Sequence, residues 1–244
     1  MMKFDVAALT DVGLKREINQ DSVLVNHDLG LFVVADGMGG HRGGEVASAL
    51  AVETVQDFLR DRLNEFRQAP KKLLVEAYRE ASARIHSKST NESPELMGMG
   101  TTMVLMMILQ DKAYIANVGD SRAYLYRAPN LWQMTEDHSL INEQIKAGVI
   151  MEEEAGHVLG RNVITRSVGF EREVIADLVE RQIQPDDLFL LCSDGLSGLI
   201  TNEKIAEVCK KGSLKEIAQK CVSEAKKAGG DDNVSVILIK PLPA

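Results

Sequence analysis

The chain has 244 residues, with 45% hydrophobic and 26% charged side chains, which is ordinary for a soluble globular protein. Its formal net charge of −8 argues against nonspecific nucleic-acid binding. Three cysteines without a CxxC pair, no apolar run of membrane-spanning length and no signal-peptide pattern together predict a cytoplasmic protein that contacts no membrane.

The first third of the chain contains strand patterns followed by helix patterns. Residues 4–13 are expected to form a strand that ends in a turn, and residues 22–37 a hairpin. Apolar residues then recur at spacings of three and four from Gly44 to Leu63, which predicts a long amphipathic helix. A second helix is expected from Pro70, since proline suits a first turn, and the polar, glycine-rich residues 87–100 are expected to form a loop.

Short strand patterns dominate the second half of the chain, and their hairpin spacing favours antiparallel pairing. The expected strands are 101–110, 112–119, 121–128, 131–135, 173–183, 187–195 and 233–242. Residues 139–165 interrupt this series with charged, short helical patterns at 140–148 and 151–158, so we expect them to form a flap. Two further helices are expected at 202–211 and 213–229.

The order of these elements is not the strict alternation of a parallel sheet. It predicts an α+β protein in which helices cover antiparallel sheets. Because no internal repeat or linker is visible, we expect one domain, residues 1–244, with residues 139–165 as a flap subdomain within it.

Most of the chemical information lies in short turns where an aspartate stands at or near a glycine, at the end or the start of a strand-like run. Each such turn is called an acidic corner below. Asp36, Asp120 and Asp194 each follow an apolar, strand-like run, and the Asp231–Asp232 pair leads into one. Desolvating a carboxylate costs several kcal/mol unless something compensates. Several such corners suggest a shared compensator, and hard divalent cations such as Mg²⁺ or Mn²⁺ prefer carboxylate and carbonyl oxygens. The pattern therefore predicts a metal cluster.

The Asp36 corner suggests what such a cluster does. Its carboxylate is suited to bridge two cations, and the carbonyl of Gly37 to bind one of them. Two cations about 4 Å apart can activate a water and clamp a phosphoryl group. Arg16 has a planar donor fork for phosphate oxygens, and His41 is placed to protonate a departing alkoxide.

The chain resembles the metal-dependent Ser/Thr protein phosphatases, the protein phosphatase 2C family, in its compact bacterial form. The matching motifs are GLKREINQD, VVADGMGGHRGGEVAS, GMGTTMV, ANVGDSRAYLYR, TEDHS, ITRSVG, LLCSDGLS and GGDDNVSVI. Each motif alone is weak, but together they stand in the family's order over nearly the whole chain. The resemblance implies a central sandwich of two antiparallel sheets flanked by pairs of antiparallel helices, with the metals at one edge.

The same resemblance implies the metal ligands. Asp36 matches the bridging ligand, and Gly37 the residue whose carbonyl binds the second ion. Asp194 and Asp232 match ligands of the first ion; chemistry alone does not choose between Asp231 and Asp232, but the family's ligand directly precedes asparagine. Asp120, with Asp194, matches the ligand of a weaker third ion. We therefore expect two core Mn²⁺ or Mg²⁺ ions and a third that binds less tightly.

Further roles are also implied by the resemblance. Asp21 matches a residue that orders metal-bound water, Arg16 the phosphate-binding arginine and His41 the general acid. A metal-bridging hydroxide then attacks phosphorus in line, without a covalent phosphoenzyme. The expected substrates are phosphoserine and phosphothreonine proteins, including a Ser/Thr kinase and its targets, and we expect a monomer. Asp137 and His138 are interpreted as structural.

Other function classes fit less well. GMGGHRGG could cradle a nucleotide phosphate, but Asp36 would repel it, and neither GxxxxGK[ST] nor GxGxxG is present. A cysteine-based phosphatase is disfavoured because none of the cysteines is followed by an arginine-bearing phosphate loop. A catalytically silent relative that only binds phosphoproteins is the remaining alternative, although such a relative should have lost metal-site carboxylates, and all are present here.

Overall fold

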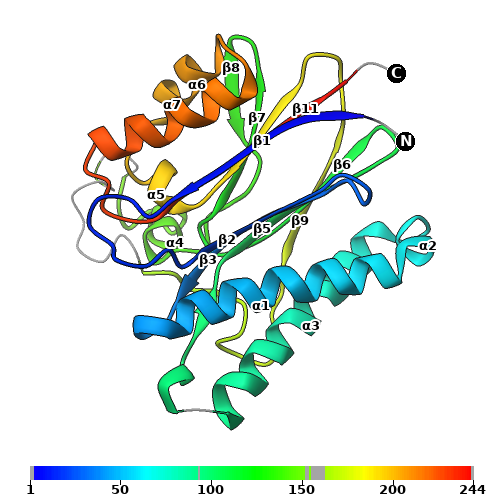
Figure 1. Ribbon diagram of the computed structural model, residues 1–244, viewed down its shortest axis with the longest axis vertical. Helices are drawn as coiled ribbons and strands as arrows, with labels where there is room; N and C mark the ends of the chain where they lie inside the picture. The colour runs from blue at the N-terminus through cyan, green and yellow to red at the C-terminus, as the bar shows by residue number, and fades with distance from the viewer. Residues whose placement is uncertain (1–2, 93, 152–153, 155–162, 243–244) are drawn as a thin grey trace.

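The computed structural model describes residues 3–92, 94–151, 154 and 163–242, without the side chains of residues 40–42 and 94. The chain folds into four layers: two helices, a sheet, a second sheet and further helices (Figure 1). These are the layers that the sequence predicts.

One sheet contains five strands in the order β1-β11-β10-β7-β8, and every pairing in it is antiparallel. Its strands are β1 (Phe4–Asp11), β11 (Val234–Pro241), β10 (Leu188–Cys192), β7 (Arg122–Arg127) and β8 (Asn130–Gln133). Its central strand therefore comes from the last quarter of the chain and pairs with strands distant in sequence.

The other sheet has the order β2-β3-β5-β6-β9, with the short β4 paired to β3, and it is also antiparallel. Its strands are β2 (Asp21–Asn26), β3 (Leu31–Met38), β4 (Gly100–Thr101), β5 (Met103–Leu109), β6 (Lys112–Val118) and β9 (Asp177–Gln182). The predicted hairpin and most of the predicted strands are thus confirmed.

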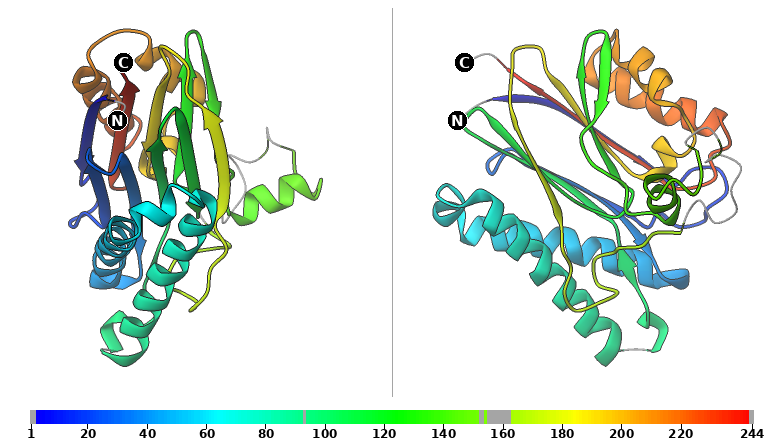
Figure 2. Two further views of the ribbon diagram at one scale, coloured as in Figure 1. Left: turned by 90° about the vertical axis from the view of Figure 1, so that its right-hand side faces the viewer. Right: turned by 180° about the vertical axis from the view of Figure 1, so that it is seen from behind.

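Helices cover the outer face of each sheet (Figure 2). The helices α1 (Gly40–Asp61), α2 (Leu63–Phe66) and α3 (Pro70–Asn91) lie on the second sheet, and α5 (Asp194–Ser197), α6 (Asn202–Cys209) and α7 (Leu214–Lys227) on the first. The helix α4 (Leu140–Lys146) belongs to the expected flap and projects from the sandwich.

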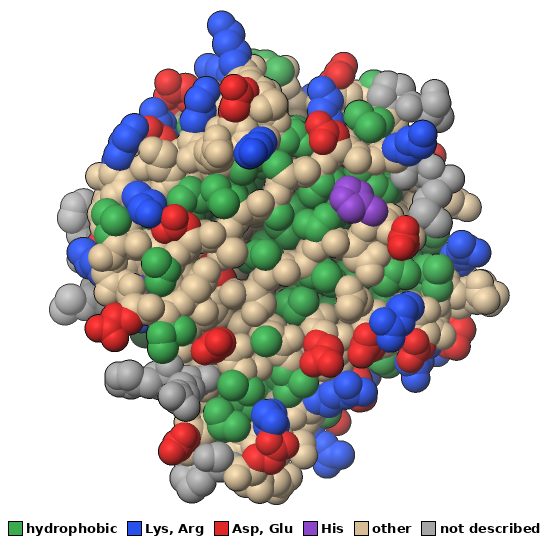
Figure 3. All heavy atoms as spheres, viewed as in Figure 1, with side chains coloured by type: hydrophobic (Ala, Val, Ile, Leu, Met, Phe, Trp, Pro, Cys, Tyr) green, Lys and Arg blue, Asp and Glu red, His purple; other side chains and the backbone are tan. Residues whose placement is uncertain are grey.

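Side chains that point alternately to the two faces of each strand explain how the layers pack together. In β3, Leu31, Val33 and Ala35 belong to the core beneath α1 and α3, whereas Phe32 and Val34 belong to the core between the sheets. Successive side chains point to opposite faces of a strand, so a strand buried on both faces is a continuous apolar run. At the edges formed by β1 and β2, the apolar core between the sheets is only partly covered, as a diagonal band of hydrophobic side chains shows (Figure 3).

Two helix boundaries differ from prediction by four residues or more. The helix α1 begins at Gly40 rather than Gly44, because residues 40–43 contain no apolar side chain by which periodicity could mark the start. A Cβ on Gly43 would lie 3.0 Å from Met99 Cβ, so this first turn packs closely. The helix α3 continues to Asn91, so the loop predicted from residue 87 was wrong at its start. The buried Ser89 holds that last turn, because its Oγ donates to Leu96 O at 2.9 Å. Most of the predicted helical pattern at 151–158 lies outside the described residues.

The ends of the described chain lie together. Phe4 pairs with Pro241, and Leu242 N donates to Lys3 O at 2.9 Å. The same strand pair ends at Asp11 and Val234, at the far side of the sandwich. No helix among the described residues is both long and apolar enough to cross a membrane.

Candidate active site

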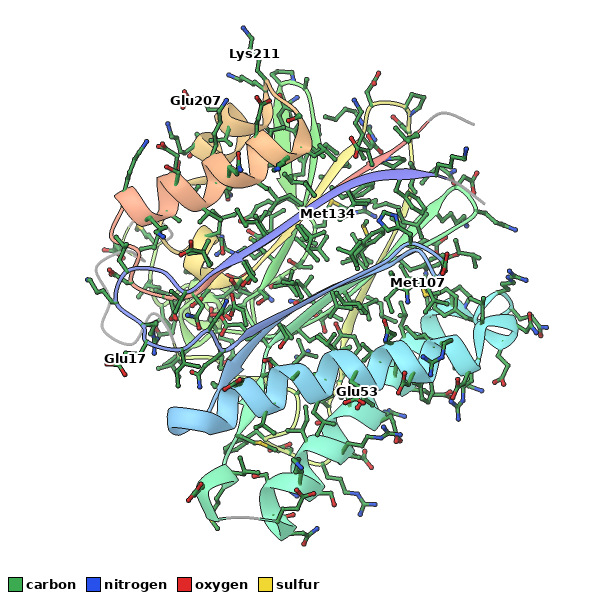
Figure 4. All side chains as sticks on the ribbon, viewed as in Figure 1. Glu17, Glu53, Met107, Met134, Glu207 and Lys211 are labelled. Atoms are coloured by element: carbon green, nitrogen blue, oxygen red, sulfur yellow. The ribbon has the colours of Figure 1, made fainter. Side chains whose placement is uncertain are left out.

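The predicted site residues converge at one end of the sandwich, where the loop that carries Glu17 lies, while Met107 lies toward the opposite end (Figure 4). A cleft of about 690 Å³ opens at this end. Its lining includes most of the residues that the sequence predicts: Arg16, Asp36, Gly37, Asp120, Asp194 and Asp232. These residues are scattered over more than 200 positions of sequence and meet only through the fold.

Asp36 lies near the end of β3, directly opposite Asp21 of β2. Its backbone is fixed by Thr102, whose N–H donates to Asp36 O at 2.9 Å and whose Oγ1 accepts from Asp36 N at 3.2 Å. The same Thr102 Oγ1 lies 2.7 Å from the hydroxyl oxygen of Ser121. A short hydrogen-bonded path therefore joins the Asp36 corner to the Asp120 corner.

Asp194 is the first residue of α5, immediately after β10. The preceding Ser193 donates its hydroxyl to Asp21 Oδ2 at 2.7 Å and accepts from Ser235 N at 3.0 Å. Ser193 therefore ties Asp21 to the Asp194 corner. Asp21 itself does not line the cleft but lies behind Asp36.

The buried Asn233 holds a loop of the site in place through its side-chain hydrogen bonds, a role that the sequence analysis did not predict. Its Oδ1 accepts from Gln20 N at 2.7 Å, and its Nδ2 donates to Val12 O and Ile18 O, both at 3.0 Å. These bonds hold the loop between β1 and β2 against the residues before β11. The only sequence signal was the position of this asparagine directly after Asp232.

Arg16 lies on that loop and is bonded to a predicted metal ligand. Its NH2 donates to Asp232 Oδ2 at 2.8 Å, and the neighbouring Lys15 pairs with Asp231 at 2.6 Å. The loop approaches closely because Gly13 has φ of 82° and a Cβ there would lie 2.2 Å from Asp232 O. Arg16 thus reaches the carboxylate cluster, although here it faces a carboxylate and not a phosphate.

Gly37 and His41 stand where β3 meets α1. A Cβ on Gly37 would lie 1.9 Å from Gly44 O, so only glycine allows this approach. His41 lies in the first turn of α1, and its side chain is outside the described part of the structure. The predicted role of His41 therefore rests on its backbone position.

Burial and mutual repulsion raise the pKa values of these carboxyl groups. Burial, followed by the charges of Asp21 and Asp194, raises the pKa of Asp36 well above its ordinary value. Burial is also the main cause at Asp120, whose pKa is raised to about 7, and at Asp21, whose pKa is raised to about 6. The pKa of Asp194 is raised as well, mainly by burial.

The donor set fits divalent cations. The buried oxygens Asp21 Oδ1 and Asp194 Oδ1 have no hydrogen-bond partner. Unsatisfied buried carboxylate oxygens are unfavourable, and a cation would satisfy them. Among the described residues no three His, Cys, Asp or Glu side chains are grouped so that they alone could hold an ion, so a bound cation would need further oxygen ligands such as backbone carbonyls or water. Mg²⁺ characteristically keeps several water ligands, so carboxylates arranged in pairs suit it.

A second cleft, of about 580 Å³, lies beside the first and shares Asp120, Asp194 and Asp232 with it. Its other wall includes Ser139 and Ile141 of the expected flap and residues 201–203 at the start of α6. Ile164, near the other end of the expected flap, lines the first cleft. The described parts of residues 139–165 therefore border the carboxylate cluster on both sides.

Comparisons with known proteins agree with this geometry. The model of the family described as protein phosphatase 2C matches residues 10–234. The serine/threonine phosphatase stp of Listeria monocytogenes serotype 4b is 38% identical over 236 residues, which cover 95% of this chain and 93% of that protein. Protein phosphatase PhpP of Streptococcus pneumoniae is 36% identical over 245 residues, with 96% of each chain covered.

Solved structures give the same result. The serine/threonine phosphatase PstP/Ppp of Mycobacterium tuberculosis superimposes with a TM-score of 0.90 at 34% identity, covering 98% of this chain and 99% of that one. The catalytic domain of PstP in complex with two manganese ions has a TM-score of 0.87 at 33% identity, and both chains are covered completely. The two antiparallel sheets and their flanking helices are thus shared with these structures.

Proposed function

The chain belongs to the protein phosphatase 2C family, and we propose from this that it hydrolyses phosphoserine and phosphothreonine on proteins in a metal-dependent reaction. The observation that carries the proposal is the convergence of Asp36, Asp120, Asp194 and Asp232 in one cleft. Buried carboxylate oxygens without hydrogen-bond partners lie in the same cluster.

The carboxylates have distinct proposed tasks. Asp36 would contribute to both core ions, the carbonyl of Gly37 would bind the second of them, and Asp194 and Asp232 would hold the first. Asp120 and Asp194 would hold a third, weaker ion. When bound, Mn²⁺ or Mg²⁺ would supply a water of lowered pKa and offset the charge of the phosphoryl oxygens.

The other residues bind substrate and move a proton. Arg16 would exchange its contact with Asp232 for the equatorial oxygens of the phosphate, a contact that its donor fork suits. Asp21, behind Asp36, would orient the attacking water. As the new bond from that water oxygen to phosphorus forms, the bond to the serine or threonine oxygen breaks. His41 would give that leaving oxygen its proton.

The biological setting follows from the proposed reaction. The substrates would be phosphorylated proteins, among them a Ser/Thr kinase and its targets. We further propose that the protein acts as a monomer in the cytoplasm. Residues 139–165 would form a flap beside the substrate within a single domain.

Hydrolysis of a phosphothreonine peptide by the purified chain tests the function. Phosphate release should require added Mn²⁺ or Mg²⁺ and should stop with EDTA. Asp194→Ala, which removes a proposed ligand, should abolish it. A folded wild-type protein that binds the phosphopeptide but releases no phosphate with either metal would support the silent phosphoprotein-binding relative instead.

His41→Ala tests the proton donor separately. It should lower the kcat for a phosphothreonine peptide about 100-fold or more but affect p-nitrophenyl phosphate much less, because that leaving oxygen needs no proton. Mn²⁺ binding should be unchanged. Equal losses on both substrates would remove His41 from this role.

A further inference from the structure

The segment Thr135–Ser139, which follows β8, has no task in the proposed reaction, yet it contacts the Asp120 corner closely. Gly119 and His138 form a reciprocal pair: His138 N donates to Gly119 O and Gly119 N donates to His138 Nδ1, both at 3.0 Å. Gly119 has φ of 99°, and a Cβ there would lie 2.5 Å from Thr102 Cβ, so the corner is tightly confined.

This pairing sets the tautomer of His138. Because Nδ1 accepts the Gly119 N–H, the ring proton resides on Nε2, which lies 3.2 Å from Asp177 Oδ2. Arg166 NH1 lies 3.1 Å from this nitrogen but cannot donate to it in this tautomer, and donates instead to Asp177 Oδ1 at 2.9 Å. Burial, which outweighs the contact with Asp177, lowers the pKa of His138, in agreement with a neutral ring. Asp177 therefore orients a ring that in turn holds Gly119.

The residues after Asp120 are held as well. Arg122 donates to both oxygens of Asp137, from Nε at 2.9 Å to Oδ1 and from NH2 at 2.6 Å to Oδ2. Ser121 Oγ lies 2.7 Å from Thr102 Oγ1. The residues on either side of Asp120 are thus fixed, while Asp120 itself lines both clefts.

His138 also contacts the expected flap at its base. Its carbonyl accepts from Thr165 N at 2.9 Å, and Ser139 forms a β-bridge with Ile164. Leu140 N donates to Val163 O at 2.8 Å. Both ends of residues 139–165 are therefore attached beside the residue that holds Gly119.

We propose that His138 is a positioning residue that holds Asp120 in place for a divalent cation shared with Asp194. This inference rests on the proposed function, which makes Asp120 a metal ligand. A residue that orients a ligand without touching the ion typically changes metal affinity by tenfold to a hundredfold when it is removed. His138 would act on the weaker ion and leave the two core ions unaffected.

Mn²⁺ titration of the full chain, followed by the electron paramagnetic resonance of free Mn²⁺, tests the proposal. Asp120→Ala gives the benchmark for loss of the weaker site. His138→Ala, which leaves Gly119 N–H without its acceptor, should weaken that site about tenfold and raise the Mn²⁺ concentration for half-maximal hydrolysis equally. The tight sites should keep their affinity.

Two further variants separate positioning from general stability. His138→Asn places Oδ1 where Nδ1 stood, so it should bind Mn²⁺ within about twofold of wild type. Asp177→Ala removes the carboxylate that faces His138 Nε2 and orients the ring, so it should weaken the same site without changing His138. His86→Ala is the control, because His86 bonds the backbone at Phe170, away from Asp120.

Several results would overturn the inference. These are wild-type Mn²⁺ binding in both His138→Ala and Asp177→Ala, a lower melting temperature as their only change, or His138→Asn as weak as His138→Ala. Unchanged binding in Asp120→Ala would overturn it too. Failure of the proposed function would appear differently, as a wild-type chain that binds Mn²⁺ but releases no phosphate.

Discussion

A buried aspartate flanks β10 at each end, and the two differ in their hydrogen-bond and ion-pair partners. Before the strand, Asp187 is fully buried and accepts from Arg127 Nε at 2.8 Å, Arg127 NH2 at 3.1 Å and Gln184 N at 2.9 Å. After the strand, Asp194 has one buried oxygen without a partner and lies among other carboxylates. Among the described residues, Asp187 forms an ion pair with a cationic side chain and Asp194 forms none.

This difference separates stability from function within a single strand. A buried carboxylate with a bidentate arginine is satisfied and fixes the geometry of its surroundings. A buried carboxylate left beside like charges is unfavourable to the fold and persists where it serves chemistry. The comparison therefore predicts that substitutions at the two ends affect different quantities.

The largest expected effect is on catalysis at the Asp194 end. Asp194→Asn should lower kcat/KM for a phosphothreonine peptide at least about 1,000-fold, because a neutral amide is a poor ligand for the ions that activate water. Steady-state kinetics at saturating Mn²⁺ measures this. A loss below about tenfold would show that Asp194 is no essential ligand and would break the comparison.

At the opposite end, Asp187→Asn should act on stability alone. It leaves Arg127 without its charged partner and should lower the free energy of unfolding by about 2 to 3 kcal/mol, below the range for fully buried pairs because the Arg127 side chain is 37% exposed. Urea denaturation measures the loss, and kcat per folded molecule should be unchanged. The exposed pair Arg60–Asp57 is the control, where Arg60→Gln should cost less than about 0.5 kcal/mol.

The pH dependence of the metal-free protein sharpens the contrast. The pKa values of Asp21, about 6, and Asp120, about 7, lie above the ordinary 3.8. At pH values between 3.8 and these raised values, the folded state therefore binds more protons than the unfolded state. Stability should therefore fall as pH rises from about 4 to about 7. Melting temperatures in EDTA measure this fall, and saturating Mn²⁺ should abolish it. A melting temperature that rises over this range in EDTA would contradict the prediction.

The smallest expected effect is a gain. In EDTA at pH 8, Asp194→Asn should raise the free energy of unfolding by about 1 kcal/mol, because it removes one charge from a repulsive cluster. The same substitution thus stabilises the metal-free protein and destroys its activity. Destabilisation comparable to that of Asp187→Asn would mean that both ends of β10 serve the fold.

Sequence patterns predicted the fold well where the periodicity was local. The hairpin of β2 and β3 and the helix α7 follow directly from alternation and from three-and-four spacing. The last turn of α3 was missed because Lys88 to Asn91 are polar. The buried Ser89 ties this turn to Leu96 and Gly98, which follow in the chain. Local polarity does not reveal such a contact.

The site was predictable in its residue types but not in its contacts. The corners at Asp36, Asp120 and Asp194 were recognisable from acidic residues next to glycine. The bond between Arg16 and Asp232 spans 216 positions and has no local signal. The same holds for Asn233 and for the pairing of His138 with Gly119, which depend on how separate loops pack in three dimensions.

The pairing of β1 with β11 has a mechanical consequence. The two strands are antiparallel, and the described chain ends at Phe4 and Pro241 lie at the same end of the pair. A force that pulls these ends apart would load the hydrogen bonds one after another, as in a zipper, and not all together in shear. Rupture would then begin about 24 Å from Asp11 and Val234, since seven residue steps of a strand span that length. The catalytic end would be the last part of this seam to open.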